Sequence, residues 1–379
     1  MNFNAEIEID LKKLRSNMIN LKEAYADYAF IFANLKNNAF GMGYGIVDTL
    51  TKNGVNYIYV SALEEALEIR RHNKKVPILV NYEVKREYIY DAIMNNITIT
   101  ISSLEHLQSI IDMKLKDKLL IHLLIDNGSN KIGLNGPTEV ETAYHLIKNN
   151  ASFSLEGIYT ELTTYGITDD DFYMEANVFF KAIQSVDTDN LIIHLNEPMM
   201  YHKKQSLVNG IRFDLACLGI EENIDDSIIS SMKIKSIEKR YQDLEFPEID
   251  LDLVFSIKAT VISLNNAYKG TLIGKNYIAR ENLNLAILPI GHKDGITKAI
   301  GSVWINEKIC PVVSDEIDHI IVSVPKDVKV GDTAKILNEE SDIYSILGQL
   351  KTNRFYLMSI LNNNLPRNYI NEEEEDDIL

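Results

Sequence analysis

The sequence predicts an α/β protein, a (β/α)8 TIM barrel followed by a mostly antiparallel β-domain. From about residue 30 to 220, short apolar runs rich in branched and aromatic residues alternate with amphipathic stretches, which is typical of strands joined by crossover helices. After about residue 245, apolar runs follow one another with only turn-like residues between them. Eight strand and helix units need roughly 250 residues, and a chain of 379 residues supplies them. An open doubly wound sheet is the alternative interpretation.

The elements of the barrel are predicted from their apolar runs and from the residues that begin the helices. Two helices begin with a capping box, Ser61 with Glu64 and Ser102 with Glu105, in which each side chain satisfies a backbone donor of the other residue. The eight expected strands are residues 30–36, 56–62, 76–81, 97–103, 119–126, 153–162, 191–196 and 211–220. The expected strands of the second domain lie in residues 252–264, 284–291, 302–314 and 319–324.

The alternation of apolar runs and amphipathic stretches, and its end near residue 245, predict three segments. They are a barrel over residues 1–240, a β-domain over 241–370, and an acidic, disordered tail over 371–379. The tail contains EEEEDD at 372–377, which accounts for six of the negative charges and is typical of a solvated extension.

The composition excludes several classes of protein. The formal net charge of −17 disfavours a nucleic-acid backbone as partner. Cys217 and Cys310 are too few for a disulfide framework, so we expect a reducing, cytoplasmic location. The sequence has neither a signal peptide pattern nor an apolar run of about 18 residues, and its eight histidines form no ligand pair at helical spacing. We therefore expect no membrane span and no metal site.

Residues at the ends of the strands are the candidates for chemistry, because the active site of such a barrel lies at the carboxyl ends of its strands. Lys36 closes the first run, and burial at the barrel mouth would make its amine easier to deprotonate, as an imine-forming lysine requires. A rim lysine is more often a solvated charge. The GMGYG of residues 41–45 follows, and such glycines mark a tight turn more often than a phosphate cradle.

LKNNAFGMG, which contains Lys36, resembles the VKANAYGHG motif of the alanine racemases, barrel enzymes that use pyridoxal 5'-phosphate. Further stretches follow the same family in order across nearly the whole chain. They are VSALEEALEIR at 60–70, IDNGSNKIGL at 125–134, SIKATVIS at 256–263, ILPIGHKDG at 287–295 and NEKICPVV at 306–313.

The resemblance implies a cofactor, a mechanism and a homodimer. Lys36 would hold pyridoxal phosphate as a Schiff base, and Arg212 would face the pyridine nitrogen and keep it unprotonated. Alanine racemases interconvert L-alanine and D-alanine with two bases, this lysine and a tyrosine from the β-domain of the partner subunit. The site would therefore combine one barrel with the partner's β-domain.

The sequence departs from this pattern at the second base and at the phosphate. Ile273 stands at the position of the catalytic tyrosine, and isoleucine transfers no proton. Tyr277 matches a second, non-catalytic tyrosine, and Tyr268 lies five residues upstream of Ile273; both are expected to be ordinary strand residues. The altered phosphate contacts are Phe40, Phe355 and Pro198, which lack hydroxyls, and Asp214, which replaces a glycine whose amide approaches the phosphate.

Other replacements lie around the ring of the cofactor. Lys131 replaces an arginine that would contact the phenolic oxygen, and Leu124 replaces a lysine that orients this arginine. Glu161 replaces a histidine, and its carboxylate is expected to neutralise Arg212 rather than act as a new base.

Three further positions belong to the substrate side of the site by resemblance. His292 replaces a tyrosine, Lys298 keeps the positive charge of an arginine, and Asp318 lies in the IDH at 317–319 that replaces an MDQ segment with one residue deleted.

Two hypotheses of different class remain open. The first is a pyridoxal phosphate racemase of alanine or another small amino acid, with weakened cofactor contacts. The second is a catalytically impaired relative with a binding, regulatory or structural role. A cofactor-dependent decarboxylase on the same scaffold is a third, without a motif of its own.

Overall fold

The computed structural model describes residues 4–162, 169–196, 206–220, 249–275, 277–339, 341, 343–361 and 364–372. The chain divides into two compact units. The first to be described comprises residues 15–39 and 44–251, and the second comprises residues 1–14, 40–43 and 252–379.

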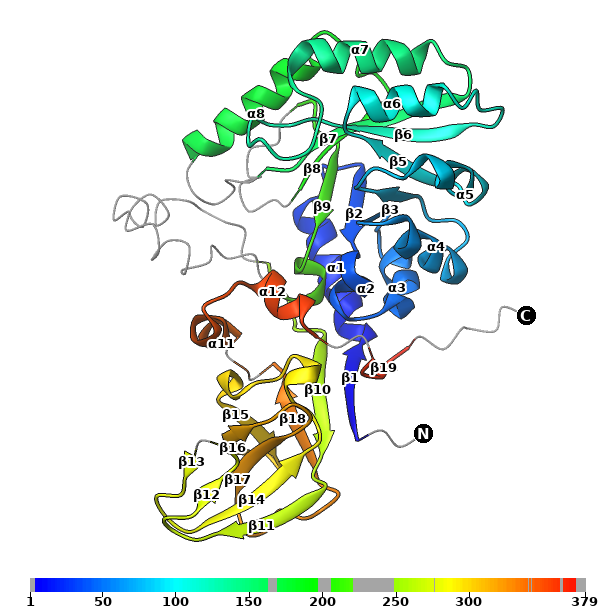
Figure 1. Ribbon diagram of the computed structural model, residues 1–379. Coiled ribbons are helices and arrows are strands. Elements are labelled where there is room, and N and C mark those ends of the chain that lie inside the picture. The colour runs from blue at the N-terminus through cyan, green and yellow to red at the C-terminus, as the bar shows by residue number, and fades with distance from the viewer. Residues whose placement is uncertain are drawn as a thin grey trace, which may run out of the picture. The chain divides into compact units, whose positions relative to one another are not determined.

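The first unit is a closed barrel in which eight strands follow one another in sequence order, and each pairs in parallel with its neighbours (Figure 1). This confirms the predicted TIM barrel: seven predicted runs each contain one of its strands, and the eighth, 211–220, overlaps β9, which begins one residue earlier. The strands are β2 (Phe30–Asn34), β3 (Tyr57–Val60), β4 (Ile78–Val80), β5 (Ile97–Ile101), β6 (Leu119–Leu124), β7 (Phe153–Thr160), β8 (Ile192–Asn196) and β9 (Gly210–Phe213).

Helices follow the barrel strands, as the crossover pattern predicts. Both predicted capping boxes are shifted by one residue. The backbone N–H groups of Ser61 and Ala62 donate to Glu65, not Glu64, and Ser103, not Ser102, caps the later helix by accepting from the N–H of His106. The helices are α1 (Leu11–Ala24), α2 (Lys36–Phe40), α3 (Val47–Lys52), α4 (Leu63–His72), α5 (Ile89–Met94), α6 (Leu104–Ile111), α7 (Gly136–Lys148) and α8 (Asp169–Ile183).

The barrel interior is aromatic and partly polar. Phe32 of β2 stacks on Tyr57 of β3 with ring centroids 4.6 Å apart, and on His194 of β8 at 4.2 Å. Tyr159 of β7 stacks on the same histidine at 4.6 Å. Inward-facing residues of the strands thus fill the barrel as a packed core.

The second unit contains a nine-stranded sheet in the order β11-β14-β17-β16-β15-β18-β10-β1-β19. All its pairs are antiparallel except β1 with β19, so the predicted mostly antiparallel β-domain is confirmed. A separate pair joins β12 (Leu272–Ile273) to β13 (Tyr277–Ile278). The strands of the large sheet are β1 (Ala5–Asp10), β10 (Phe255–Thr260), β11 (Ser263–Ala267), β14 (Leu283–Leu288), β15 (Ser302–Ile305), β16 (Lys308–Asp315), β17 (Ile320–Val324), β18 (Thr333–Leu337) and β19 (Arg367–Ile370).

Strand β1 corrects the predicted assignment of residues 1–240 to the barrel. Its sequence AEIEID alternates apolar and charged residues, and Ile7 and Ile9 are fully buried. It pairs with β10, Ala5 opposite Ala259, and therefore belongs to the antiparallel sheet. Strands β18 and β19 and the helices α11 (Ile343–Leu350) and α12 (Arg354–Ser359) also lie outside the predicted elements of this domain.

Parts of the remaining predictions fall outside the described residues. The domain boundary near residue 240 lies within 221–248, Pro198 lies within 197–205, and the acidic tail lies mostly within 373–379. In the part of the chain that the structure describes, no helix is long and apolar enough to cross a bilayer, and no cluster of three or more His, Cys, Asp or Glu side chains is arranged to hold a metal.

Candidate active site

The barrel brings four charged side chains to its carboxyl end. Lys36 follows β2, Glu161 follows β7, and Arg212 and Asp214 lie in and directly after β9. Because β2 and β9 are parallel neighbours, with Ala33 opposite Phe213, the first and last strands carry Lys36 and Asp214 to the same rim.

The backbone after β2 turns in the left-handed sense. Asn37, Asn38 and Ala39 have φ of 52°, 56° and 54°, values that cost an L-residue roughly 1–2 kcal/mol each. Asparagine tolerates this region better than most residues, and the carboxylate of Glu65 accepts a hydrogen bond from the N–H of Asn37 at 2.6 Å. Such strain at a strand end is characteristic of functional sites, and here it follows immediately after Lys36.

The amine of Lys36 is enclosed by an aromatic ring and a carboxylate. Its Nζ lies 4.6 Å from the ring centroid of Tyr59 and 3.8 Å from Oε1 of Glu161. Burial lowers the pKa of Lys36 below its ordinary value, although the charge of Glu161 opposes this change. The expected desolvation of this lysine is thus present in the structure.

The carboxylate of Glu161 is ionised and held from two sides. The hydroxyl of Tyr59 donates a hydrogen bond to its Oε1, and Lys36 faces the same oxygen. Burial opposes ionisation, but the charges of Lys36 and Arg212 and the bond from Tyr59 together hold the pKa of Glu161 below its ordinary value. Lys36 is therefore the ion-pair contact of Glu161, and the charge of Arg212, its predicted partner, also favours the ionised carboxylate.

Arg212 is 1% exposed, and its partners are neutral. The guanidinium donates to the carbonyl of Thr160 at 3.1 Å and to Nδ1 of His194 at 2.9 Å. Its Cζ lies 4.7 Å from the ring centroid of Tyr59 and 5.0 Å from that of Tyr159. β9 is hydrogen-bonded to a strand on each side within the closed barrel. The side chain of Arg212 is held by groups of the two strands that precede β9, Thr160 of β7 and His194 of β8.

Two buried histidines extend this contact into the barrel. Nε2 of His194 lies 3.0 Å from Nδ1 of His122. Since Arg212 donates to Nδ1 of His194, we assign the proton of His194 to Nε2 and that of His122 to its own Nε2. Burial and the charge of Arg212 lower the pKa of His122 to about 3 and that of His194 well below its ordinary value.

The sequence analysis missed these two histidines. Each stands fourth in an apolar strand run, LLIHLL and LIIHLN, at a position where a fully buried strand offers no reason for a polar residue. A histidine within an otherwise apolar run is the sequence signal from which these two residues could have been predicted. No hydrogen bond to Nε2 of His122 occurs within the described residues.

Asp214 is bound on its own side of the mouth. Its Oδ1 accepts a hydrogen bond from Nδ2 of Asn34 at 2.5 Å, and Oδ1 of Asn34 accepts from the backbone N–H of Lys36 at 3.2 Å. Burial raises the pKa of Asp214, against the hydrogen bond from Asn34 and the charge of Lys36. Asn34 thus links the carboxylate of Asp214 to the backbone of Lys36, directly before the left-handed turn.

The two remaining candidates of the barrel, Lys131 and Leu124, lie outside these contacts. Lys131 is exposed in the loop after β6, and its charge contributes to the lowered pKa of Glu161. Leu124 is 1% exposed and packs in the aromatic core of the barrel. The arginine and the lysine of the family pattern are thus replaced by an exposed cation and by an apolar core residue.

The predicted site residues of the second unit form two groups there. Ile273 is 4% exposed and packs with Ala267, Ala279, Leu285 and Val313, so it is a core residue. In the other group, Nε2 of His292 lies 2.9 Å from Oδ2 of Asp315, which also accepts from the backbone N–H of Lys298 at 2.8 Å. Asp315 was not predicted.

Other predicted residues of this unit lie apart from those two groups. Asp318 bonds to its neighbour His319 at 2.8 Å. The rings of Phe40 and Phe355 are 6.2 Å apart, and neither carries a hydroxyl that could donate to a phosphate.

The GMGYG glycines lie in a tight turn, as predicted. Gly41 and Gly43 have φ of 85° and 79°, values that favour glycine. The carbonyl of Gly41 accepts from Nε of Arg367 at 2.8 Å, and a Cβ at Gly43 would lie 2.5 Å from the hydroxyl of Tyr369. Strand β19 therefore packs directly against this turn.

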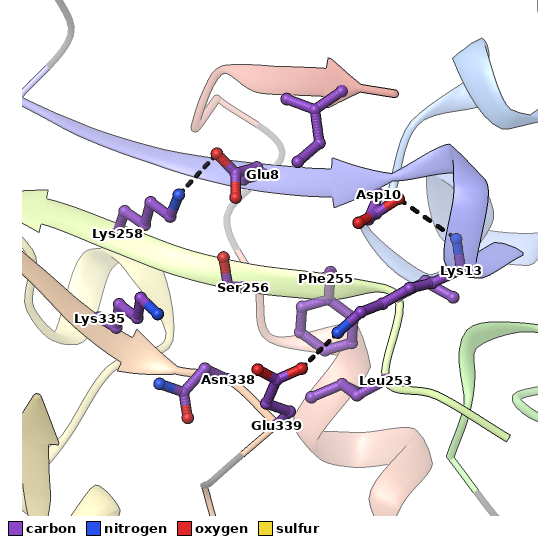
Figure 2. Close-up of a pocket in the computed structure, with 12 residues that line it drawn as sticks. Glu8, Asp10, Lys13, Leu253, Phe255, Ser256, Lys258, Lys335, Asn338 and Glu339 are labelled. Atoms are coloured by element: carbon purple, nitrogen blue, oxygen red, sulfur yellow. Dashed lines mark hydrogen bonds and ion pairs between the residues drawn. The ribbon is translucent and has the colours of Figure 1, made fainter. Parts of the chain in front are cut away.

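A hollow of about 120 Å³ in the second unit contains none of the predicted site residues (Figure 2). Ligand sites have volumes of roughly 300–1,000 Å³, so this one is small. Glu8 bonds to Lys258 at 2.6 Å, and Lys13 bonds to Glu339. Its charges thus compensate one another, which is typical of a structural ion-pair network across a sheet.

The comparisons with known proteins identify the family. The family model described as alanine racemase, N-terminal domain, matches residues 9–206, and that described as alanine racemase, C-terminal domain, matches residues 254–369. An alanine racemase from Halalkalibacterium halodurans is 26% identical, with 97% of this chain and 95% of that protein aligned. One from Helicobacter pylori is 26% identical, with 96% and 98% aligned.

Solved structures show the same fold over nearly the whole chain. The alanine racemase of E. faecalis superposes with a TM-score of 0.85 at 22% identity and covers 97% of this chain and 98% of its own. A histidine racemase from Leuconostoc mesenteroides has the same TM-score at 21% identity, with the same coverage. These findings confirm the resemblance inferred from the motifs: the chain belongs to the alanine racemase family.

Proposed function

We propose that this protein is an amino-acid racemase that interconverts the L and D forms of alanine or another small amino acid. The observation that carries the proposal is Lys36, a desolvated amine of lowered pKa at the carboxyl end of the barrel, with the buried guanidinium of Arg212 below the same tyrosine. We further propose a cytoplasmic homodimer, as the family pattern implies and the absence of a spanning helix among the described residues allows.

The family uses pyridoxal 5'-phosphate, and the barrel residues fit the reactive end of this cofactor. Lys36 offers the amine that an aldehyde requires, and Arg212 offers a donor that two neutral histidines hold in one orientation. When bound, the cofactor supplies an electron-withdrawing ring that acidifies the α-hydrogen of the amino acid. Lys131 is the candidate for the phenolic oxygen.

The phosphate end fits less well. Asp214 presents a carboxylate where the family pattern has a glycine amide, and a second negative charge there disfavours a dianion. Phe40 and Phe355 replace hydroxyl donors, and each lost hydrogen bond costs ~1 kcal/mol. We therefore propose that the cofactor binds weakly in comparison with relatives that retain these donors.

The residues of the chain divide the work of proton transfer. Lys36 holds or releases a proton at Nζ, and its lowered pKa makes the neutral amine accessible. Arg212 stays protonated and serves only as a hydrogen-bond donor, because arginine does not deprotonate in proteins. Tyr59 and Tyr159 exclude water from the floor of the site, since both are buried.

A second candidate function is the binding of a free amino acid without a cofactor. The balance of charge at the barrel mouth favours this function. The two cations, Lys36 and Arg212, are compensated by two carboxylates, those of Glu161 and Asp214, so that no phosphate is needed to balance them. The ring of Tyr59 also lies near both cations, with its centroid 4.6 Å from Nζ of Lys36 and 4.7 Å from Cζ of Arg212. Such a mouth is complementary to a zwitterion.

An absorbance titration of the purified protein with pyridoxal phosphate, before and after borohydride, separates the two candidates. A racemase gives an imine band that borohydride traps in the wild type and not in Lys36→Ala. Deuterium incorporation from D₂O into alanine and histidine then identifies the substrate. No band at saturating cofactor, together with calorimetric binding of a free amino acid, would favour the binding protein.

A further inference from the structure

Racemisation needs a proton donor on each face of the α-carbon, and this chain lacks the usual second one. Ile273 stands where the family pattern has its catalytic tyrosine, and it is 4% exposed within an apolar cluster. Its side chain carries no transferable proton. A racemase built from this chain must therefore take its second proton-transfer group from elsewhere.

Among the described residues, the barrel mouth offers several groups that could serve, and the ring centroid of Tyr82 lies 6.0 Å from Nζ of Lys36, against 4.6 Å for that of Tyr59. Tyr59 and Tyr159 are buried, and burial raises the pKa of both hydroxyls. Asp214 is bound by Asn34. Glu161 combines an ionised carboxylate, an accessible side chain that is 28% exposed, and direct contact with Lys36.

The surroundings of Glu161 suit a proton carrier. Oε1 receives the hydroxyl of Tyr59 and faces Nζ of Lys36 at 3.8 Å, so the carboxylate is oriented through one oxygen. Within the described residues no hydrogen bond uses Oε2, which leaves that oxygen open to a substrate.

We propose that Glu161 is the second catalytic acid and base of this protein and works with Lys36 inside a single barrel. This inference rests on the proposed racemase function. It changes the origin of the second base, because both groups come from one subunit.

The proton balance of this pair closes. In one direction Glu161 removes the α-proton, the electron pair of the C–H bond stays with the substrate, and the ammonium of Lys36 delivers a proton to the opposite face. The pair is then a carboxylic acid and a neutral amine. The neutral amine of Lys36 is the form that can bond to the cofactor again, and the carboxylic acid of Glu161 returns its proton to the amine of the departing product.

The contact also explains why the pair must open. Substrate has to enter between the two groups so that each meets a different face of the α-carbon. Both side chains retain freedom for this movement, since Lys36 is 22% exposed and Glu161 28%. The closed pair thus corresponds to the protein before cofactor and substrate bind.

The test compares Glu161→Gln and Glu161→Asp with the wild type in the presence of pyridoxal phosphate. Glutamine keeps the shape and the acceptor for Tyr59 but removes acid and base function. We expect Glu161→Gln to retain the trapped imine, to lose racemisation by roughly 10²–10⁴-fold, and to exchange the α-hydrogen of one enantiomer only. Glu161→Asp should recover part of the racemisation.

Glu156→Gln is the matched control, because it places the same substitution in β7, the strand that ends directly before Glu161. The carboxylate of Glu156 bonds to Tyr57 and Thr98 instead of Lys36. Its racemisation should remain near the wild-type rate. Unchanged racemisation in Glu161→Gln, or loss of its imine, would overturn the proposal and leave the racemase function standing. A wild type without an imine would instead overturn both.

Discussion

The guanidinium of Arg212 donates to Nδ1 of His194 at 2.9 Å, and this single contact sets the protonation of a buried chain that continues to His122. The arginine cannot give up its proton, so the histidine nitrogen must accept. Both histidines are therefore neutral donors and acceptors in series. Hydrogen bonds thus connect the guanidinium of Arg212 at the barrel mouth to His122 in the barrel interior.

Stability should fall as the pH falls below 6.5, because of these two histidines. The pKa of His122 is 6.5 in the unfolded chain and about 3 in the fold, so between those values only the unfolded state binds the proton. Each such histidine contributes a slope of ~1.4 kcal/mol per pH unit. Urea denaturation at pH 7 and pH 5.5 measures this slope.

The control for this measurement is His122→Phe, which keeps a ring and removes one titrating group. The variant should be less stable at pH 7 and should lose less stability on acidification. An identical slope in the two proteins would contradict the neutral, buried histidine pair.

Arg212→Met should destabilise the barrel by about 1–3 kcal/mol, since it leaves Nδ1 of His194 and the carbonyl of Thr160 without their donor. The free energy of unfolding in urea reports the loss. Lys131→Met provides the comparison, because this lysine is exposed and should change stability little. Equal effects of the two substitutions would contradict the role assigned to Arg212.

Asp214→Asn should bind pyridoxal phosphate at least about tenfold more tightly than the wild type, because it removes a negative charge and keeps the acceptor for Asn34. Absorbance titration gives the two dissociation constants. Asp117→Asn removes an exposed charge on the barrel surface and should leave the constant unchanged. An unaltered affinity in Asp214→Asn would show that this carboxylate does not meet the phosphate.

Tyr59→Phe should move the acidic limb of the pH–rate profile to higher pH. The hydroxyl of Tyr59 helps hold the pKa of Glu161 below its ordinary value, so its removal raises that pKa. A base must be deprotonated to act, and activity would therefore be lost at a higher pH than in the wild type. A profile that does not move would separate Glu161 from the proton transfer.

Much of the fold follows from local patterns. The eight barrel runs were predicted because short stretches of branched and aromatic residues, bounded by turns, need no distant partner to be recognised. The same logic placed Lys36 at a strand end, whereas Arg212 was predicted from the resemblance to the alanine racemases. The capping residues are shifted by one: Glu65 accepts from the N–H groups of Ser61 and Ala62, and Ser103 accepts from that of His106, while the hydroxyl of Ser102 donates to Glu83.

Pairings across long separations were not predictable in this way. Strand β1 joins β10, about 250 residues away, and its alternating pattern alone fits either unit. Glu161 is predicted to neutralise Arg212, but its contact with Lys36, which follows the first barrel strand, was not predictable from local patterns. Which side chains meet at the mouth depends on strand register, and register is set only when the barrel closes.

By itself, the sequence determined the family, the order of strands and the position of each charged residue along its strand, because these depend on local composition and on motifs read in order. The tertiary structure decided the partners: Lys36 with Glu161, Arg212 with two histidines that no motif had marked, and Asp214 with Asn34. The reason is physical. A buried charge is defined by what surrounds it in space, and in a closed barrel those neighbours come from strands that lie far apart in the chain.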